Sequence, residues 1–256
     1  MIPPIKELRA ICQEPVRQAE QGVFTNALYR GASIYVTKLF LQINITANQC
    51  TLLFTLLGVV GGVTLAIGTY WTNVIAALLF QISYLLDFVD GEIARYRRTS
   101  SRKGLFLDLI GHHFIDGALF AGLSFSAYAS THQSYMFALA FTAFVGIMSL
   151  YDLPLIRAYI AKRSGGTLDP MQPSSEHAAA QGLPLAANRP ERRARRVMSV
   201  ISRLLWLWSS PGIFGFTLIG ALLNRLDLVV CFLGISSPIV FIRQAYYEAR
   251  ALEAKG

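Results

Sequence analysis

Charged residues are scarce in this chain of 256 residues: Asp, Glu, Lys and Arg make up only 15% of it, whereas hydrophobic residues make up 54%. A soluble domain usually carries about 25% charged residues. So little charge leaves too few polar side chains to cover a soluble globule, and the missing polar majority excludes disorder over most of the chain. We therefore predict an all-α integral membrane protein with several transmembrane helices.

Cysteine is also rare, and the three residues Cys12, Cys50 and Cys231 are scattered without any Cys-x-x-Cys pair. This pattern gives no support to a disulfide framework or a thiolate metal site, so we expect free thiols. A signal peptide is not expected at residues 1–10, since the first long apolar run begins only near Ile45.

Acidic residues are outnumbered, with 15 Asp and Glu against 23 Lys and Arg and a net charge of +8. On a soluble protein such an excess would suggest nucleic acid as a partner. In a chain this apolar it favours the anionic inner surface of a membrane, and we expect no nucleic-acid partner.

Six apolar stretches approach the roughly 20 residues that a helix needs to cross a bilayer. They are residues 47–67, 71–94, 104–128, 135–161, 201–223 and 226–246. The connections at 69–70 and 129–134 carry no Lys or Arg, and the connection at 224–227 carries only Arg225. Because cationic residues gather on the cytoplasmic side, this asymmetry predicts six spans with both termini in the cytoplasm.

The chain divides into four regions. Residues 1–45 are predicted to be a cytoplasmic interfacial segment: Ile5, Leu8 and Ile11 repeat at helical spacing, and a second short amphipathic helix is expected near 34–41. An unstructured tail is the alternative. Residues 46–163 would hold spans one to four, 164–197 a flexible basic linker, and 198–256 spans five and six with a short tail.

The predicted linker is rich in proline and glycine, which oppose regular structure. Five arginines lie near its end: Arg189, Arg192, Arg193, Arg195 and Arg196. They favour contact with anionic lipid, although a plain topology signal explains them equally well.

The chemistry is expected where acidic residues enter the membrane, since intramembrane charge is costly and usually functional. Asp87, Asp90, Gly91, Ala94 and Arg95 stand at helical positions i, i+3, i+4, i+7 and i+8, so they share one helix face.

The next predicted span repeats the pattern. Gly104, Asp108, His112 and Asp116 are each four residues apart and share one face. If the two helices are antiparallel neighbours, their carboxylates converge near the cytoplasmic surface, where a hard divalent cation would offset their repulsion.

Oxygen ligands beside small residues suit Mg²⁺ or Mn²⁺ carrying a phosphate substrate. Gly91, Ala94 and Gly104 leave room for a nucleotide, and Arg95 can pair with a phosphate or hold a carboxylate. The pattern predicts metal-assisted phosphoryl transfer.

These residues resemble the signature of the CDP-alcohol phosphotransferase superfamily, D-x2-D-G-x2-A-R-x8-G-x3-D-x3-D. Seven fixed positions match in identity and spacing: Asp87, Asp90, Gly91, Ala94, Arg95, Gly104 and Asp108. The final aspartate of the signature is replaced by His112. The resemblance is close from 87 to 112 and looser over the predicted six-span layout.

The resemblance implies a homodimer of six-helix bundles with a cytoplasm-facing cavity. Asp87, Asp90 and Asp108 would bind one or two divalent metals, which hold the diphosphate of a CDP-linked donor. The residues implied to line the CDP pocket are Gly91, Ala94, Arg95 and Gly104. An acceptor alcohol or alcohol phosphate would attack the donor phosphorus with CMP leaving, and CDP-diacylglycerol is the most frequent donor in the superfamily.

Replacement of the last aspartate leaves the role of His112 open. His112 and Asp108 are the predicted catalytic residues. His112 would be the general base that deprotonates the acceptor, and Asp116 could orient the imidazole ring. Alternatively, His112 is a metal ligand that favours Mn²⁺, or it marks a loss of activity.

Acceptor binding has weaker signals. Arg157 and Asp116 are the predicted acceptor-binding residues, but Arg157 could equally snorkel to the interface and Asp116 could bond a neighbouring helix. Glu92 is expected to lie off the site face. The rival functions are a catalytically silent or hydrolytic relative and a proton-coupled transporter; the expected location is a bacterial inner membrane.

Overall fold

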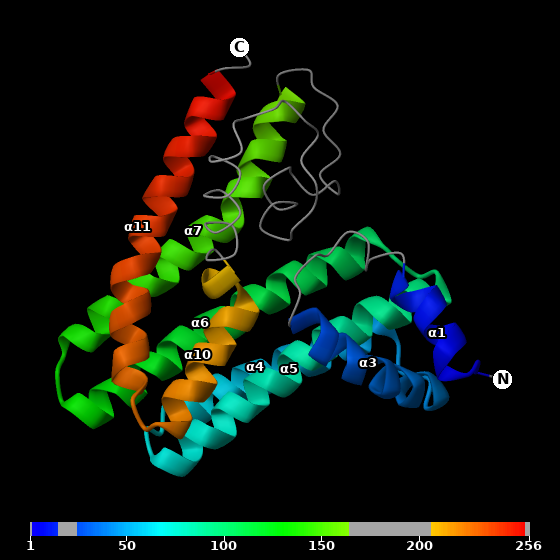
Figure 1. Cartoon of the computed structure of the whole chain (residues 1–256), viewed down its shortest axis with the longest axis horizontal. Coiled ribbons are helices and arrows are strands. Elements are labelled where there is room, and N and C mark those ends of the chain that lie inside the picture. The colour runs from blue at the N-terminus through cyan, green and yellow to red at the C-terminus, as the bar shows by residue number, and fades with distance from the viewer. Residues whose placement is uncertain (1, 15–24, 164–205, 254–256) are drawn as a thin grey trace, which may run out of the picture.

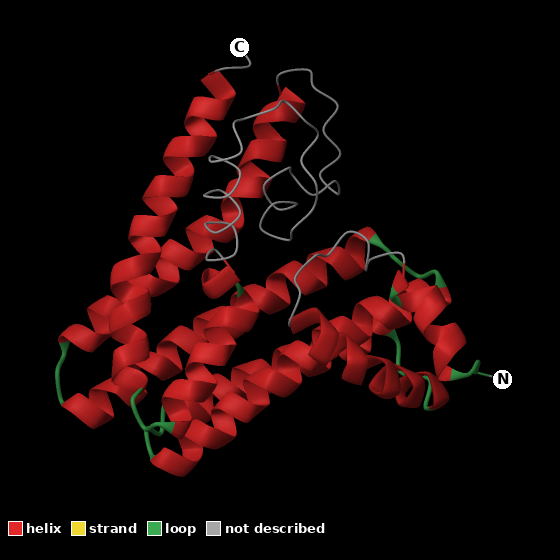
Figure 2. Cartoon of the chain, viewed as in Figure 1, coloured by secondary structure: helices red, strands yellow, loops and turns green. Residues whose placement is uncertain are grey.

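The computed structural model describes residues 2–14, 25–163 and 206–253, and within these ranges all regular structure is helical (Figure 2). The helices in chain order are α1 (Ile5–Cys12), α3 (Thr25–Gln42), α4 (Ala47–Leu65), α5 (Tyr70–Arg97), α6 (Arg102–Thr131), α7 (Tyr135–Arg163), the 3₁₀ turn η1 (Trp206–Trp208), α10 (Ser210–Leu222) and α11 (Leu226–Glu253). Five of them, α4 to α7 and α11, are long and apolar enough to span a membrane. The predicted class, an all-α integral membrane protein, is confirmed at this level.

Hydroxyl side chains begin three of these helices. The Thr46 hydroxyl accepts from the backbone N–H of Gln49, and the Gln49 side chain accepts from the Thr46 backbone, which closes a capping box at the start of α4. Thr69 makes the same motif with Thr72 at the start of α5, and Ser101 accepts from Gly104 N at the start of α6. These caps satisfy N–H groups that no helical carbonyl can reach.

The predicted fifth span at 201–223 differs from the structure. Its described part consists of η1 followed by α10, which has 13 residues. At 1.5 Å per residue such a helix is roughly 20 Å long, whereas the hydrocarbon core is about 30 Å thick. Ser209 is extended and Pro211 lies in the first turn of α10, where its missing N–H costs nothing, so a new helix begins there.

Two groups of helices make up the bundle. α4 packs against both α5 and α6, while α7 pairs mainly with α11. α10 contacts α5 and α11. The connections α4–α5, α6–α7 and α10–α11 lie toward the same end of the molecule, at the left and lower left of Figure 1, and the α5–α6 connection lies at the other end.

Small residues allow α4 and α6 to approach closely. A Cβ atom at Gly62 would lie 2.4 Å from the carbonyl oxygen of Ala118, and one at Gly122 would lie 2.4 Å from the carbonyl oxygen of Gly62. Without a hydrophobic driving force in lipid, membrane helices depend on such close van der Waals packing. The crossing therefore sets how α6 is placed beside α4.

The amino-terminal helices pack against α5. The predicted helix at residues 5–11 is present as α1, with Leu8 and Cys12 buried and Ile11 partly exposed. The predicted short helix near 34–41 is part of the longer α3, in which Ile34 and Leu41 are buried. The predicted linker 164–197 and its arginines lie outside the described residues.

Candidate active site

Three polar side chains from α5 and α6 converge on one point. Nε2 of His112 lies 3.3 Å from Oδ1 of Asp87 and 3.5 Å from Oδ1 of Asp108. One ligand atom from each of the three residues lies within 4.8 Å of the others. Asp108 and His112 are one turn apart on α6, so helical periodicity places them together. Asp87 reaches them from α5, and both helices pack against α4.

Asp90 is held differently from Asp87. Its Oδ2 accepts a 2.5 Å hydrogen bond from the hydroxyl of Thr51 on α4. The same hydroxyl is 3.1 Å from the carbonyl oxygen of Ala47, so Thr51 is tied to its own helix as well. Of the three aspartates predicted to bind metal, the structure groups Asp87 and Asp108 with His112 and leaves Asp90 oriented by Thr51. The predicted ligand set stays a prediction.

The predicted nucleotide-binding residues lie along the same end of α5 and α6. Gly91, Ala94, Arg95 and Gly104 are all partly exposed. A Cβ atom at Gly91 would lie 3.2 Å from Nη1 of Arg95, so the guanidinium lies over the glycine. Arg95 Nε donates a 2.6 Å hydrogen bond to the carbonyl oxygen of Cys12. The absence of a side chain at Gly91 therefore leaves room for the guanidinium of Arg95.

The acidic cluster fits a divalent cation. Oδ1 of Asp108 is buried, and apart from the 3.5 Å ion-pair contact with Nε2 of His112 it has no hydrogen-bond partner. A buried carboxylate oxygen without a donor is costly, and a cation would satisfy it. Two carboxylates and an imidazole form a mixed oxygen and nitrogen donor set, which suits Mn²⁺ and also allows Mg²⁺ with water.

The two residues predicted to bind the acceptor differ in their surroundings. Asp116 is 2% exposed, and its Oδ2 has no hydrogen-bond partner. Arg157 pairs with Glu248 on α11, with Nη1 3.2 Å from Oε2. Its guanidinium therefore joins α7 to α11. The acceptor site remains a prediction.

Glu92 is the polar residue whose importance the sequence analysis missed. It lies off the face of α5 that carries Asp87 and Asp90, as predicted, and it is fully buried. Its carboxylate accepts hydrogen bonds from Gln13, Ser33 and Thr37, which belong to the amino-terminal segment. In the sequence, Glu92 directly follows the motif residue Gly91. The sequence indicates a partner for its carboxylate only through Ser33 and Thr37, whose hydroxyls are four residues apart and so share one face of a helix.

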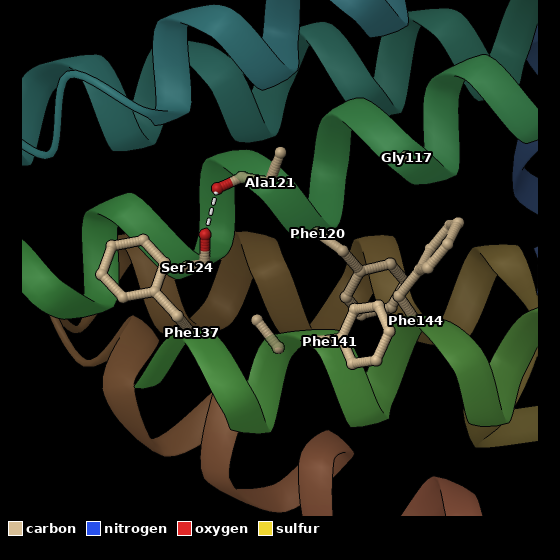
Figure 3. A pocket seen from close by; sticks show the side chains of 8 residues that line it. Gly117, Phe120, Ala121, Ser124, Phe137, Phe141 and Phe144 are labelled. Carbon is tan, nitrogen blue, oxygen red and sulfur yellow. Dashed lines mark hydrogen bonds between the residues drawn. The ribbon is translucent and has the colours of Figure 1, made fainter. Parts of the chain in front are cut away.

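An apolar cavity of about 290 Å³ lies between α6 and α7, apart from the cluster of Asp87, Asp108 and His112 (Figure 3). The Ser124 hydroxyl in its wall donates to the carbonyl oxygen of Ala121, 2.7 Å away, and is thereby satisfied. The residues that line the cavity are Gly117, Phe120, Ala121, Ser124, Phe137, Ala140, Phe141 and Phe144. Its lining offers no charged group to bind a phosphate.

Comparison with known proteins identifies one family. Residues 44–231 match the family model described as CDP-alcohol phosphatidyltransferase. The matched range contains the whole acidic cluster and extends from the start of α4 into α11.

The curated proteins that are similar to this chain include the following two. The bifunctional IPC transferase and DIPP synthase of Thermococcus kodakarensis is 30% identical over 150 residues, which are 58% of this chain and 33% of that protein. The phosphatidylinositol phosphate synthase of Mycolicibacterium smegmatis is 35% identical over 106 residues, which are 41% of this chain and 46% of that protein. The matched part of the chain thus spans less than half the length of either relative.

The fold also resembles a solved structure. The crystal structure of Mycobacterium tuberculosis phosphatidylinositol phosphate synthase with CDP-DAG bound has a TM-score of 0.50 and 20% sequence identity, covering 84% of this chain and 92% of that chain. At this identity the likeness supports the helical fold.

Proposed function

Because the chain belongs to the CDP-alcohol phosphatidyltransferase family, we propose that it transfers a substituted phosphate group from a CDP-linked alcohol to an acceptor alcohol, with release of CMP. The observation that carries the proposal is the convergence of Asp87, Asp108 and His112 within 4.8 Å of one another. This cluster lies next to Gly91 and Arg95, which suit a nucleotide diphosphate. CDP-diacylglycerol is the proposed donor, as in the solved relative with CDP-DAG bound.

The roles of the residues follow from their chemistry. Asp87 and Asp108 would hold a divalent cation, with Mg²⁺ and Mn²⁺ as the candidates. Asp90, oriented by its hydrogen bond from Thr51, would be a further ligand. When bound, the cation would neutralise charge on the donor diphosphate. Arg95 would pair with a phosphate oxygen. The oxygen of the acceptor alcohol forms a bond to the donor phosphorus, the bond from phosphorus to the CMP oxygen breaks, and the acceptor proton passes to a basic side chain.

We assign His112 to metal binding rather than to proton removal. Its Nε2 faces Asp87 and Asp108 at 3.3 Å and 3.5 Å, the direction in which a shared cation would lie. The ring also contacts Phe54, with centroids 5.7 Å apart, which restricts its rotation. A nitrogen ligand in this place would shift the preference toward Mn²⁺. The acceptor proton would then go to another group, and Asp116, one turn deeper on α6, is the proposed base.

The membrane arrangement extends from the five long helices. We propose that α10 belongs to a sixth crossing, since the α10–α11 connection lies at the same end as the other two tight connections (Figure 1). Both termini and the acidic cluster would then face the cytoplasm. Of the Lys and Arg residues, Arg225 alone would lie in a connection on the opposite side of the membrane. A bacterial inner membrane, a homodimer and contact of the basic segments with anionic lipid complete the proposal.

The amino-terminal helices fit an interfacial position. α3 turns Ser33 and Thr37 inward, while Leu28, Tyr35 and Leu39 on its opposite side are exposed. Exposed apolar side chains along one helix face are typical of a helix that lies against lipid.

The proposal is tested by measuring CMP release from CDP-diacylglycerol in micelles. The acceptor panel would contain glycerol 3-phosphate, inositol phosphate, inositol and serine, each with Mg²⁺ or Mn²⁺. We expect release that requires one acceptor and is lost in Asp108→Ala and His112→Ala, whereas His113→Ala, an exposed neighbour on the same helix, retains it. Nucleotide binding without release for any acceptor would favour the silent relative, the alternative that replacement of the last motif aspartate by His112 supports.

A further inference from the structure

A buried carboxylate connects the amino-terminal helices to the motif helix. Glu92 is 0% exposed. Its Oε1 accepts hydrogen bonds from Gln13 Nε2 at 2.7 Å and from Ser33 Oγ at 2.6 Å, and its Oε2 accepts one from Thr37 Oγ1 at 2.6 Å. Burial of a carboxylate is costly unless donors surround it, and these three supply the donors. The conformation that places α1 and α3 on α5 is therefore the one that satisfies Glu92.

Gln13 completes the link between three segments. Its Nε2 is 2.7 Å from the carbonyl oxygen of Arg30 on α3 as well as from Glu92 on α5, and the residue directly follows α1. The amide is buried, so these contacts replace hydrogen bonds to water. Displacement of α1 would break both contacts together.

Arg95 lies one helical turn after Glu92 on α5. Its Nε donates to the carbonyl oxygen of Cys12, the last residue of α1, over 2.6 Å. The guanidinium lies over Gly91, where a Cβ atom would be 3.2 Å from Nη1. Arg95 thus packs over Gly91 on one side and is held by a hydrogen bond to the end of α1 on the other. Anything that moves α1 also removes the acceptor that orients Arg95.

We propose that Glu92 is a positioning residue that docks α1 and α3 on α5 and, through the carbonyl of Cys12, orients Arg95 toward the diphosphate of the donor. The docking does not depend on the reaction, whereas the orientation of Arg95 toward a nucleotide rests on the proposed function. Glu92 itself need not touch the donor. Its neighbours Asp90 and Gly91 belong to the site, so one helical turn joins the site to the amino-terminal helices.

The docking is tested with the full chain in lipid nanodiscs by alkylation of Cys12 with N-ethylmaleimide, followed by mass spectrometry of its peptide. Cys12 is fully buried while α1 is docked. Glu92→Gln places an amide N–H₂ group against hydroxyl or amide donors, so we expect alkylation to accelerate by about tenfold or more. Removal of the Glu92 charge also lowers the pKa of Cys12, which by itself speeds alkylation. Thr37→Val keeps the carboxylate beside Cys12 and removes one donor, so the smaller acceleration expected from this variant reports the undocking of α1 alone. Glu7→Gln, an exposed carboxylate on α1, is the matched control and should leave the rate unchanged.

The effect on Arg95 is tested by CDP binding measured with calorimetry in the presence of Mn²⁺. We expect Glu92→Gln to weaken CDP binding about tenfold, as Arg95→Ala does, and to weaken it no further when added to Arg95→Ala. Such non-additivity would show that Glu92 acts through Arg95, and a general loss of folding would not produce it.

Four results would overturn the proposal or its nucleotide part. Unchanged Cys12 alkylation in Glu92→Gln would show that Glu92 does not dock α1. Faster alkylation with unchanged CDP affinity, or additive losses with Arg95→Ala, would show that docking does not reach Arg95. Absence of CDP binding by the unmodified chain would refute the proposed function and the nucleotide part of this inference, while the Cys12 measurement would still decide the docking.

Discussion

Nε2 of His112 on α6 lies 3.3 Å from Oδ1 of Asp87 on α5. The contact joins residues from two helices that both pack on α4, and Asp108, one turn before His112, lies 3.5 Å from the same nitrogen. An imidazole nitrogen that faces two carboxylates is well placed to share a cation with them.

Substitution of His112 should change the metal affinity. His112→Ala is expected to weaken Mn²⁺ binding by at least about 10- to 100-fold, since loss of a group that only supports a ligand already has an effect of this size. His112→Asp should restore binding and shift the preference toward Mg²⁺, because it replaces a nitrogen with oxygen ligands. Calorimetry with each metal measures both effects.

The nitrogen contact can be observed without turnover. Pulsed electron paramagnetic resonance of bound Mn²⁺ should show coupling to a ¹⁴N nucleus that disappears in His112→Ala and persists in His113→Ala. Persistence of the coupling in His112→Ala would contradict the assignment and return His112 to the role of a base.

Thr51 should matter for the site more than for folding. Thr51→Val removes the 2.5 Å hydrogen bond to Asp90, which leaves a carboxylate oxygen without its donor. We expect the transfer rate to fall about tenfold or more, since hydrogen bonds to charged groups contribute about 1.5–3 kcal/mol. Thr51→Ser should retain most of the rate. Thr64→Val is the control, since the partly exposed Thr64 donates to the carbonyl oxygen of Val60 within α4; an equal loss there would contradict a specific role for Thr51.

The crossing of α4 and α6 should tolerate no added side chain. Gly62→Ala places a Cβ 2.4 Å from the carbonyl oxygen of Ala118, so the backbones must separate, and we expect a loss of about 1–3 kcal/mol in the free energy of unfolding. Gly215→Ala on α10 meets no atom within 4 Å and should be neutral or slightly stabilising. Thermal unfolding in detergent compares the two, and equal Tm values would contradict the close approach.

Docking of α1 should weaken at high pH. Burial, followed by the nearby Glu92 carboxylate, raises the pKa of Cys12 from 9.0 to about 11. A raised folded pKa means that the stabilising neutral thiol is fully present below pH 9, and that stability falls as pH rises through the window from about 9 to 11. Hydrogen exchange of α1 amides should report this loss after correction for the intrinsic rate. Cys12→Ala should remove the part of this pH dependence that arises from the thiol. If the exchange of α1 amides depends on pH in the same way with and without Cys12, the prediction is wrong.

Much of the site could be predicted from spacing within single helices. Asp87, Asp90, Gly91, Ala94 and Arg95 share a face because helical periodicity fixes their relative directions. Contacts between helices could not be predicted in this way, because they depend on how each helix is rotated and how closely it packs. Thr51 on α4 therefore escaped attention as the partner of Asp90.

The predicted span at 201–223 shows another limit of the sequence pattern. Its apolar content predicts a single span although Ser209, Ser210, Pro211 and Gly212 interrupt it, and in the structure Pro211 lies in the first turn of a new helix of 13 residues. Hydropathy averages over a window and does not register where one helix ends and the next begins.

The amino-acid sequence by itself determined the helical membrane class, the positions of five long helices and the family signature, because composition and helical periodicity are local properties. The tertiary structure decided which groups meet. It placed His112 among carboxylates and turned Glu92, on the other side of α5, toward Gln13, Ser33 and Thr37. The packing of α6 on α4 and of α1 and α3 on α5 determines these contacts, and it depends on residues far apart in the chain.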